Sequence, residues 1–220
     1  RMHRFLPIGI LLSLITLASL EPLGSQTIDS LAFKDLQFRM AGPFRGGRSS
    51  AVTGFPANLD RWLMGTTGGG VWETTDNGIS WHNISDGFFG GSIGAVRVAD
   101  SDPNVIYVGQ GSVDIRGNTS TGRGMWKSMD AGRTWTFIGL PEAGQIGRIE
   151  VHPANHNLVY VAALGHPFGK NPERGIFRSE DGGETWEHVL ALNDSTGASD
   201  LTMDMVNPRI LYAGMWRGER

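Results

Sequence analysis

An eight-residue motif that recurs along the chain constrains the fold more than any other feature of the sequence. We call it the box motif, and its pattern is S-x-D-x-G-x-T-W. It stands at residues 128–135 and 179–186, and a softer copy, with Thr and Ser exchanged at the flanking positions, stands at residues 74–81. A motif that recurs at intervals of about 50 residues is typical of a repeat architecture, and this period suits one propeller blade per repeat.

Every defined position of the box motif has a structural explanation. The Asp carboxylate can accept hydrogen bonds from backbone N–H groups of its own turn, and the Gly two positions later can adopt a positive φ. The closing Trp is a large apolar side chain with a single N–H that needs an acceptor. We therefore expect the Asp residues to be structural, the alternative being a catalytic role, and the Trp side chains to be equivalent and buried between sheets. The residues concerned are Asp76, Gly78, Trp81, Asp130, Gly132, Trp135, Asp181, Gly183 and Trp186.

The segments between the box motifs follow the same order in each repeat. An alternating run comes first, a turn with Pro comes next, a continuous apolar run follows, and a third short run leads into the box motif. With a fourth strand leaving from the box Trp, these segments make one antiparallel blade. The apolar runs lie at residues 62–65, 105–109, 158–162 and 210–214. The predicted fold is therefore all-β: a β-propeller of four-stranded antiparallel blades at residues 44–90, 91–140 and 144–192, with an incomplete blade at 198–220.

An array of about three and a half blades leaves unpaired strand edges and an exposed flank. Propellers avoid such edges by closing into a ring of about four to eight blades. We therefore expect the 220 residues to be the front of a longer protein. The remainder of the same propeller is then the first expected partner of these blades.

The composition favours an all-β chain and excludes several classes of function. The chain contains 32 Gly and no Cys, which suits many tight turns and rules out disulfides and thiolate metal sites within it. A net charge of −3 provides no broad basic surface for nucleic acid. No metal-binding spacing such as H-E-x-x-H is present, and Gly68-Gly69-Gly70 lacks the Lys and the helix of a phosphate-binding loop. We therefore expect no cofactor, no metal and no nucleic-acid partner.

The first 25 residues predict export. A short basic opening precedes an almost wholly apolar run at residues 5–20, and this order is typical of a secretory signal peptide covering residues 1–25. The run is shorter than the roughly 20 residues of a membrane span, and an uncleaved membrane anchor is the alternative. We expect a secreted or periplasmic protein that has no membrane contact after cleavage. Residues 26–43 form a lead-in, in which the alternation at residues 36–40 favours an outer strand.

Four further stretches carry a family resemblance. They are R-G-G-R at 45–48, G-G-G-V-W at 68–72, S-I-G-A-V at 92–96 and D-P-N-V-I-Y-V-G at 102–109. Together with the box motifs they resemble Asp-box propellers, whose repeats are also called neuraminidase-type or BNR repeats. More narrowly, they resemble a large family of secreted bacterial proteins that carry a domain similar to the sortilin N-terminal domain. Those proteins are often labelled glycosyl hydrolase-like, by kinship with xyloglucanases. The resemblance covers about residues 35–220 and implies the propeller fold.

The resemblance implies two classes of function, because one fold hosts both. The first is an exported binding or scaffold module that presents loops to a peptide or glycan partner, in a sortilin-like manner. The alternative is a glycoside hydrolase of the xyloglucanase-like class acting on a polysaccharide. Such an enzyme needs a pair of carboxylates flanking the scissile bond, here partly outside this sequence. No catalytic residue can be matched to a family motif, and Asp114 and Asp200 are carboxylate candidates by position alone.

Blade geometry predicts where a ligand site would lie. The box turn joins the third and fourth strands, so it shares a rim with the turn joining the first and second. The opposite rim carries the second-to-third loops and the crossovers between blades, and two of these loops are long, at residues 110–123 and 164–174. Loops on a rigid scaffold often carry function.

Polar residues in these loops and in the first crossover are the predicted ligand-binding residues. Side chains of Arg, Asp, Asn and His suit hydroxyl-rich or carboxylate ligands through paired hydrogen bonds. The alternative is that the loops are solvated, or that Arg and Asp pair with each other to pin them. The set, which we call the rim candidates, is Arg45, Arg48, Asp114, Arg116, Asn118 and His166, and Arg123 and Arg174 are expected on the same rim.

Overall fold

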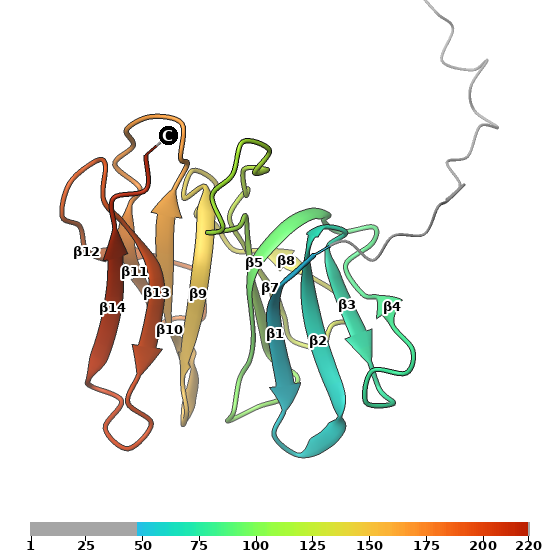
Figure 1. Ribbon diagram of the computed structural model, residues 1–220. Coiled ribbons are helices and arrows are strands. Elements are labelled where there is room, and N and C mark those ends of the chain that lie inside the picture. Colours follow the sequence, from blue (N-terminus) through green and yellow to red (C-terminus); the bar gives the residue numbers. More distant parts are fainter. Residues whose placement is uncertain (1–47, 220) are drawn as a thin grey trace, which may run out of the picture. The chain divides into compact units, whose positions relative to one another are not determined.

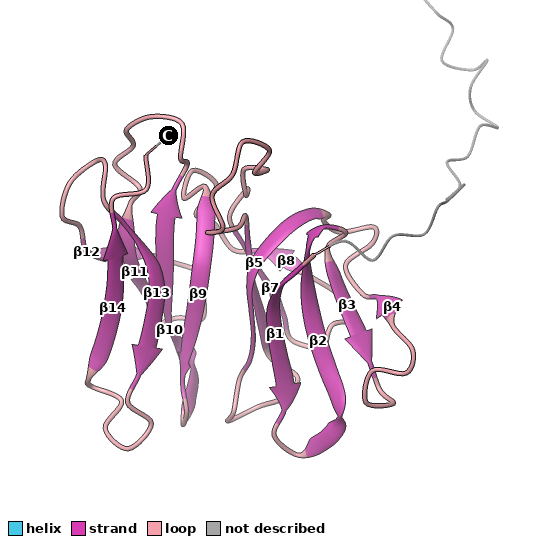
Figure 2. Cartoon of the chain, viewed as in Figure 1, coloured by secondary structure: helices cyan, strands magenta, loops and turns pink. Residues whose placement is uncertain are grey.

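The computed structural model describes residues 48–219, and all regular structure in this range is β-strand (Figure 2). These residues belong to one compact unit of the chain, residues 46–220. Its strands are β1 (Ser49–Phe55), β2 (Asn58–Gly68), β3 (Val71–Thr74), β4 (His82–Asn83), β5 (Gly91–Val98), β6 (Ile106–Gln110), β7 (Met125–Ser128), β8 (Thr136–Phe137), β9 (Gln145–His152), β10 (Asn155–Gly165), β11 (Gly175–Ser179), β12 (Glu187–Leu190), β13 (Gly197–Met203) and β14 (Leu211–Trp216).

The strands pair as antiparallel neighbours in sequence order, which is the pairing of propeller blades. Strands β1 to β4, β5 to β8 and β9 to β12 make three four-stranded blades, and β13 pairs with β14 as a two-stranded hairpin. The first two blades are continuous, because Thr67 and Gly68 at the end of β2 pair with Ser92 and Gly91 at the start of β5. The predicted all-β propeller fold, present in part, is confirmed.

Several strands are longer than the apolar runs that predicted them. β2 begins at Asn58, and β10 runs from Asn155 to Gly165. Most of the added residues are polar or small, and they are held by pairing with β1 and β9. Of the two added leucines, Leu59 is exposed and Leu164 is buried. Backbone pairing to a neighbouring strand is not encoded in the hydrophobic pattern, so the sequence underestimates these strand ends.

The first strands of successive blades lie against one another, and in Figure 1 β9 lies between β13 and β5. This approach is closest at two glycines. A Cβ atom on Gly94 would collide with the carbonyl oxygen of Ile146, and one on Gly147 would collide with the carbonyl oxygen of Ser199. Only Gly allows such contact between neighbouring backbones.

The apolar core lies between blades rather than within them. One cluster joins residues of the first and second blades, including Leu63 and Ile106, and a second joins the second and third blades, including Tyr107 and Ile149. A smaller cluster packs the third blade against the β13–β14 hairpin. The second blade contributes to both large clusters and so buries both faces of its sheet, which fits its continuously apolar and buried second strand β6.

The box turns form tight networks of local hydrogen bonds. In the second repeat, Oδ1 of Asp130 accepts from the backbone N–H of Thr134 at 2.9 Å, and Oδ2 accepts from the Thr134 hydroxyl at 2.7 Å. The Ser128 hydroxyl donates to Asp130 at 2.8 Å and accepts from the backbone N–H of Gly132, also at 2.8 Å. The turns centred on Asp76 and Asp181 repeat this pattern. The box Gly residues all have positive φ: Gly78, Gly132 and Gly183.

The hydrogen bonds also place the box turns on the predicted rim. The backbone N–H of Ala131, inside the second box turn, donates to the carbonyl of Asn104 in the turn before β6 at 2.9 Å. The equivalent bond in the third repeat joins Gly182 to Asn157 at 2.9 Å. The box turns therefore lie beside the turns between first and second strands, and each box Asp bonds within its own turn.

The box Trp side chains link one blade to the blade before it. The indole N–H of Trp135 donates to the carbonyl of Ile84 at 2.9 Å, and that of Trp186 donates to the carbonyl of Ile138 at 2.6 Å. Trp81, in the first described blade, donates instead to Gly78 in its own turn at 3.2 Å. Trp135 is buried, whereas Trp81 and Trp186 are half-buried, so the expected equal burial is not observed. One reason is that the buried ring of Phe89 packs edge-on against Trp135.

Candidate functional site

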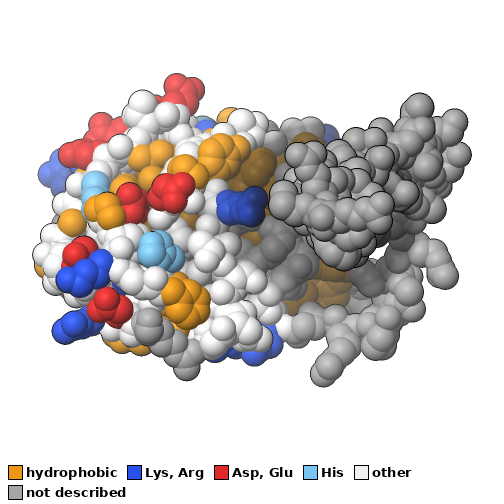
Figure 3. Space-filling model, turned by 90° about the horizontal axis from the view of Figure 1, so that it is seen from above, with side chains coloured by type: hydrophobic (Ala, Val, Ile, Leu, Met, Phe, Trp, Pro, Cys, Tyr) orange, Lys and Arg blue, Asp and Glu red, His pale blue; other side chains and the backbone are white. Residues whose placement is uncertain are grey.

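The two long loops leave the blades on the rim opposite the box turns, as predicted. They are the β6–β7 loop, residues 111–124, and the β10–β11 loop, residues 166–174, both at the upper end in Figure 1. Figure 3 looks onto this rim and shows basic, acidic and His side chains scattered among uncharged ones. The visible surface therefore mixes hydrophobic and polar side chains and is not dominated by one sign of charge.

A buried glutamine fixes the β6–β7 loop. Gln145, at the start of β9, is fully buried, and its Oε1 accepts from the backbone N–H of Ser112 at 2.5 Å. Its Nε2 donates to the carbonyl of Ser120 at 3.2 Å, so a single side chain holds both ends of the loop. Within the loop, the Thr119 hydroxyl accepts from the N–H of Arg116 at 2.9 Å and donates to its carbonyl at 3.0 Å.

A buried arginine fixes the β10–β11 loop. The side chain of Arg174 is fully buried, and its Nε donates to Oδ1 of Asn171 at 2.9 Å. The terminal nitrogens donate to five backbone carbonyls, those of Leu164, His166, Gly169, Ser195 and Gly218. The expectation that Arg174 is an available residue of the rim surface is therefore wrong. No local pattern marks this role, because three of the acceptors lie outside the loop itself.

Four of the rim candidates belong to the two long loops. Asp114 and Arg116 pair with each other in the β6–β7 loop, with 3.8 Å between Arg116 Nη2 and Asp114 Oδ2. Asn118 is exposed in the same loop, and His166 is half-buried at the start of the other. Among residues 48–219, no hydrogen bond or ion pair joins the side chains of these two loops. Gly218 lies between the β6–β7 loop and the end of β10, since an added Cβ there would lie 3.1 Å from Ile115 and 3.0 Å from Leu164.

The two remaining rim candidates lie at the entry to the first blade. Arg48 is exposed, and its carbonyl accepts from the backbone N–H of Thr67 at 3.0 Å. Arg45 lies outside the described residues, as do the predicted signal peptide and the lead-in.

A polar hollow follows the first strands of the three blades. It has a volume of about 310 Å³ and is lined by residues 49–53, 94–97 and 147–149. Its charged side chains are paired: Arg97 with Asp100 at 3.2 Å, and Arg148 with Glu150 at 3.2 Å.

A second hollow lies on the long-loop rim, and we call it the rim pocket. It has a volume of about 410 Å³ and lies between the crossover from β4 to β5 and the β6–β7 loop. The sequence analysis missed it because most of its lining comes from strand ends and the crossover. The lining residues are Phe88, Phe89, Gly90, Gly91, Ser92, Gln110, Ser120, Thr121, Arg123 and Trp126.

The two candidate carboxylates are solvated. Asp114 has 69% of its side chain exposed, and Asp200 has 74% exposed and lies 3.9 Å from Nε of Arg148. A carboxylic acid that donates a proton to a sugar leaving group usually has a raised pKa because it is buried in an apolar site. Neither residue has such surroundings.

Metal-binding clusters and membrane-spanning helices are both absent from residues 48–219. No group of three or more His, Asp or Glu side chains is placed to hold a metal ion. No helix long and apolar enough to cross a membrane occurs in that range.

Comparisons with known proteins find two kinds of curated relative. A xyloglucanase of Hypocrea jecorina is 30% identical over 130 residues, which is 54% of this chain and 14% of that protein. The vacuolar protein sorting/targeting protein 10 of Pyricularia oryzae is 32% identical over 92 residues, 40% of this chain and 6% of that protein. No protein-family model matches the chain.

Among solved structures, an ancestral GH74 enzyme superposes with a TM-score of 0.61 at 20% identity, over 78% of this chain and 22% of that one. The likeness at this identity supports the propeller fold. This chain spans only a small part of the length of each of these relatives.

Proposed function

We propose that these blades belong to a binding module that presents its long-loop rim to a glycan or peptide partner. The observation that carries the proposal is the way the two long loops are held. Gln145 and Arg174 are fully buried, and between them they bond to both long loops, to the end of β10, to the crossover before β13 and to the segment after β14. Loops fixed in advance lose little conformational entropy when a ligand binds, so this arrangement favours recognition.

Polar side chains of the β6–β7 loop supply the recognition groups, with Asp114 and Asn118 exposed and Arg116 half-buried. Asp114, Arg116 and Asn118 stand on a loop whose backbone is pinned beneath them. Their guanidinium, carboxylate and amide groups can pair with hydroxyl or carboxylate groups of a ligand. We include the other rim candidates in the proposal, with Arg45 and Arg48 contributing from the entry to the first blade.

We further propose that the module is exported and that its repeats belong to the Asp-box class. The geometry of the box turns and the likeness to the sorting protein support a sortilin-like role. The apolar run at residues 5–20 supports export.

A second candidate function is hydrolysis of a polysaccharide. The likeness to the Hypocrea jecorina xyloglucanase favours it. In that case the catalytic carboxylates belong to other parts of the protein, since Asp114 and Asp200 are both solvated. Incubation of the full-length protein with xyloglucan separates the two functions, because only a hydrolase releases new reducing ends.

The binding proposal is tested with the double variant Asp114→Ala/Arg116→Ala. The full-length protein is first screened on glycan and peptide arrays, and the affinity for each hit is then measured by calorimetry. We expect the double variant to bind about 10-fold more weakly or worse, because the loop loses both charged groups.

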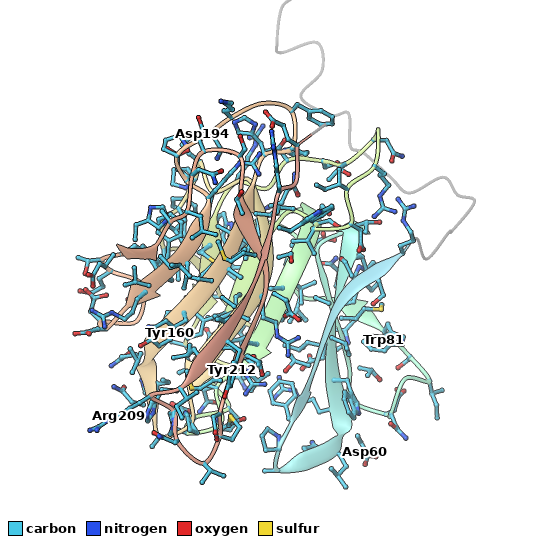
Figure 4. The ribbon with its side chains drawn as sticks, turned by 60° about the vertical axis from the view of Figure 1, so that its left-hand side comes forward. Asp60, Trp81, Tyr160, Asp194, Arg209 and Tyr212 are labelled. Carbon is cyan, nitrogen blue, oxygen red and sulfur yellow. The ribbon has the colours of Figure 1, made fainter. Side chains whose placement is uncertain are left out.

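The matched control is Asp60→Ala/Arg209→Ala, which also removes one acid and one base. Figure 4 labels both residues at the end of the blades opposite Asp194, on the box-turn side. The control should bind as the unchanged protein does. Equal affinity in the two double variants would exclude the Asp114–Arg116 pair from the binding site.

A further inference from the structure

We propose that the rim pocket binds a sugar residue that carries a carboxylate, that is, a uronic acid within a glycan. The inference deepens the proposed function and rests on it, because the pocket opens on the same rim. It is carried by three features of the pocket: a rigid floor, an exposed aromatic ring at the mouth, and one cation that has no acidic partner among residues 48–219.

The floor is preformed and its polar atoms are satisfied. The ring of Phe89 stacks on Trp126 at a centroid distance of 4.7 Å. The indole N–H of Trp126 donates to Oε1 of Gln110 at 3.3 Å, and Nε2 of Gln110 donates to the carbonyl of Gly90 at 2.7 Å. A ligand therefore meets a floor that needs no rearrangement to receive it.

Phe88 offers a free aromatic ring at the mouth. Its neighbour Phe89 supplies the packing that anchors the crossover, whereas Phe88 is 41% exposed and joins none of the aromatic pairs of residues 48–219. The face of an aromatic ring is electronegative and attracts groups with a positive edge. The C–H face of a pyranose ring presents such groups, together with apolar area.

Arg123 makes the pocket favour a negatively charged ligand. Its side chain is exposed and makes no ion pair within the described part of the chain, and no Asp or Glu lines the pocket there. A guanidinium binds a carboxylate through two parallel hydrogen bonds, which are stronger than bonds to neutral hydroxyls. The hydroxyls of Ser120 and Thr121 lie in the same lining and can bond the remaining hydroxyls of a sugar.

The pocket suits a sugar better than a peptide strand. Peptides often bind by pairing with an unpaired strand edge. The strand ends at this pocket are already paired, Gly91 with Gly68 and Ile93 with Gln110. The volume of about 410 Å³ falls at the lower end of the range typical of small-molecule sites, roughly 300–1,000 Å³.

The test measures calorimetric binding of the full-length protein to oligogalacturonate and to its methyl ester. The two ligands share the same sugar chain and differ at the carboxyl group, which is an anionic carboxylate in the acid and a neutral methyl ester in the other. We expect the acid to bind at least about 10-fold more tightly than the ester, because a charge-assisted pair is lost in the ester.

Three variants locate the binding. Arg123→Gln should reduce affinity for the acid about 10-fold and leave binding of the ester unchanged. Phe88→Ser should reduce the affinity for both the acid and the ester, since the contact with the aromatic ring does not depend on charge. Arg133→Gln, an exposed arginine in the second box turn, is the matched control and should change neither.

The outcomes separate this inference from the proposed function. Equal affinity for acid and ester, or acid binding that survives Arg123→Gln, overturns the inference. Binding only to peptides or neutral glycans, weakened by the Asp114→Ala/Arg116→Ala variant, also overturns it and leaves the proposed function standing. A protein that binds no ligand on either array contradicts both.

Discussion

At the scale of single residues, the most consequential side chain is a guanidinium shielded from water. Such a group must find acceptors for its N–H bonds, and backbone carbonyls supply them at Arg174. The acceptors belong to the end of β10 and the β10–β11 loop that follows it, to the crossover before β13 and to the segment after β14. Arg174 therefore joins three segments that no strand pairing connects.

Replacement of Arg174 by Met should strongly destabilise the protein. The change leaves five carbonyls without their donor, and each buried unsatisfied group costs about 1–3 kcal/mol. We expect the free energy of unfolding, measured in urea, to fall by about 3 kcal/mol or more. Arg217→Met is the control, because that side chain is 76% exposed, and it should change the value by less than about 0.5 kcal/mol. A loss at position 174 no larger than at 217 would contradict the assigned role.

At the scale of elements, the box turn stabilises its own hairpin through local hydrogen bonds, and its Trp bonds to the preceding blade. The link reaches from Trp135 to Ile84 and from Trp186 to Ile138, in each case to the residue three positions after the preceding box Trp. One element thus closes its own hairpin and fixes the distance to the neighbouring sheet.

Replacement of Trp135 by Ala should cost about 3–5 kcal/mol of unfolding free energy, as is typical for a large aromatic removed from a core. Trp81→Ala should cost clearly less, because Trp81 is half-buried and its N–H donates within its own turn. Urea unfolding of the two variants checks the difference. Equal losses would mean that the bond to Ile84 and the contact with Phe89 contribute little.

The box carboxylates should make stability depend on acid pH. Hydrogen bonds from Ser80 lower the pKa of Asp76 from 3.8 to about 2, and hydrogen bonds from Thr134 lower that of Asp130 from 3.8 to about 2. A lowered pKa in the folded state means that the stabilisation is complete above the ordinary pKa and is lost as pH falls toward the folded value. We expect the free energy of unfolding to fall between about pH 4 and about pH 2.

Asp130→Asn tests this acid dependence. The variant should be less stable at neutral pH and should lose less stability on acidification, because one of the titrating groups is gone. Asp60→Asn, an exposed carboxylate outside the box motifs, should leave the acid profile unchanged. Parallel acid profiles for the unchanged protein and Asp130→Asn would show that the box carboxylate does not stabilise the fold.

At the scale of the whole molecule, the matched part of the chain spans 14% of the length of one curated relative and 6% of the other. Export is the prediction that belongs to this scale. Expressed from its natural gene, the protein should leave the cytoplasm and lose residues 1–25, since a basic opening and a short apolar run direct secretion. Mass spectrometry of the mature protein should find Gln26 at its N-terminus, and an intact N-terminus in the membrane fraction would instead support the anchor.

The sequence alone determined what depends on short-range interactions. The side-chain hydrogen bonds inside the box turn join residues at most four apart, such as Asp130 with Ser128 and Thr134. An eight-residue sequence pattern is therefore enough to predict the turn. The order of strands and the rim of the long loops follow from the same repeat.

Only the tertiary structure decided which polar residues are used inside the molecule. Arg174 and Arg116 are both arginines in polar loops, yet one is surrounded by carbonyls from distant segments and the other lies beside Asp114 at the surface. The rim pocket likewise combines the crossover, the end of β6 and the β6–β7 loop, which are adjacent only once the blades have packed. The burial of a polar side chain and its hydrogen-bond partners depend on residues far apart in sequence, and a local sequence pattern does not encode them.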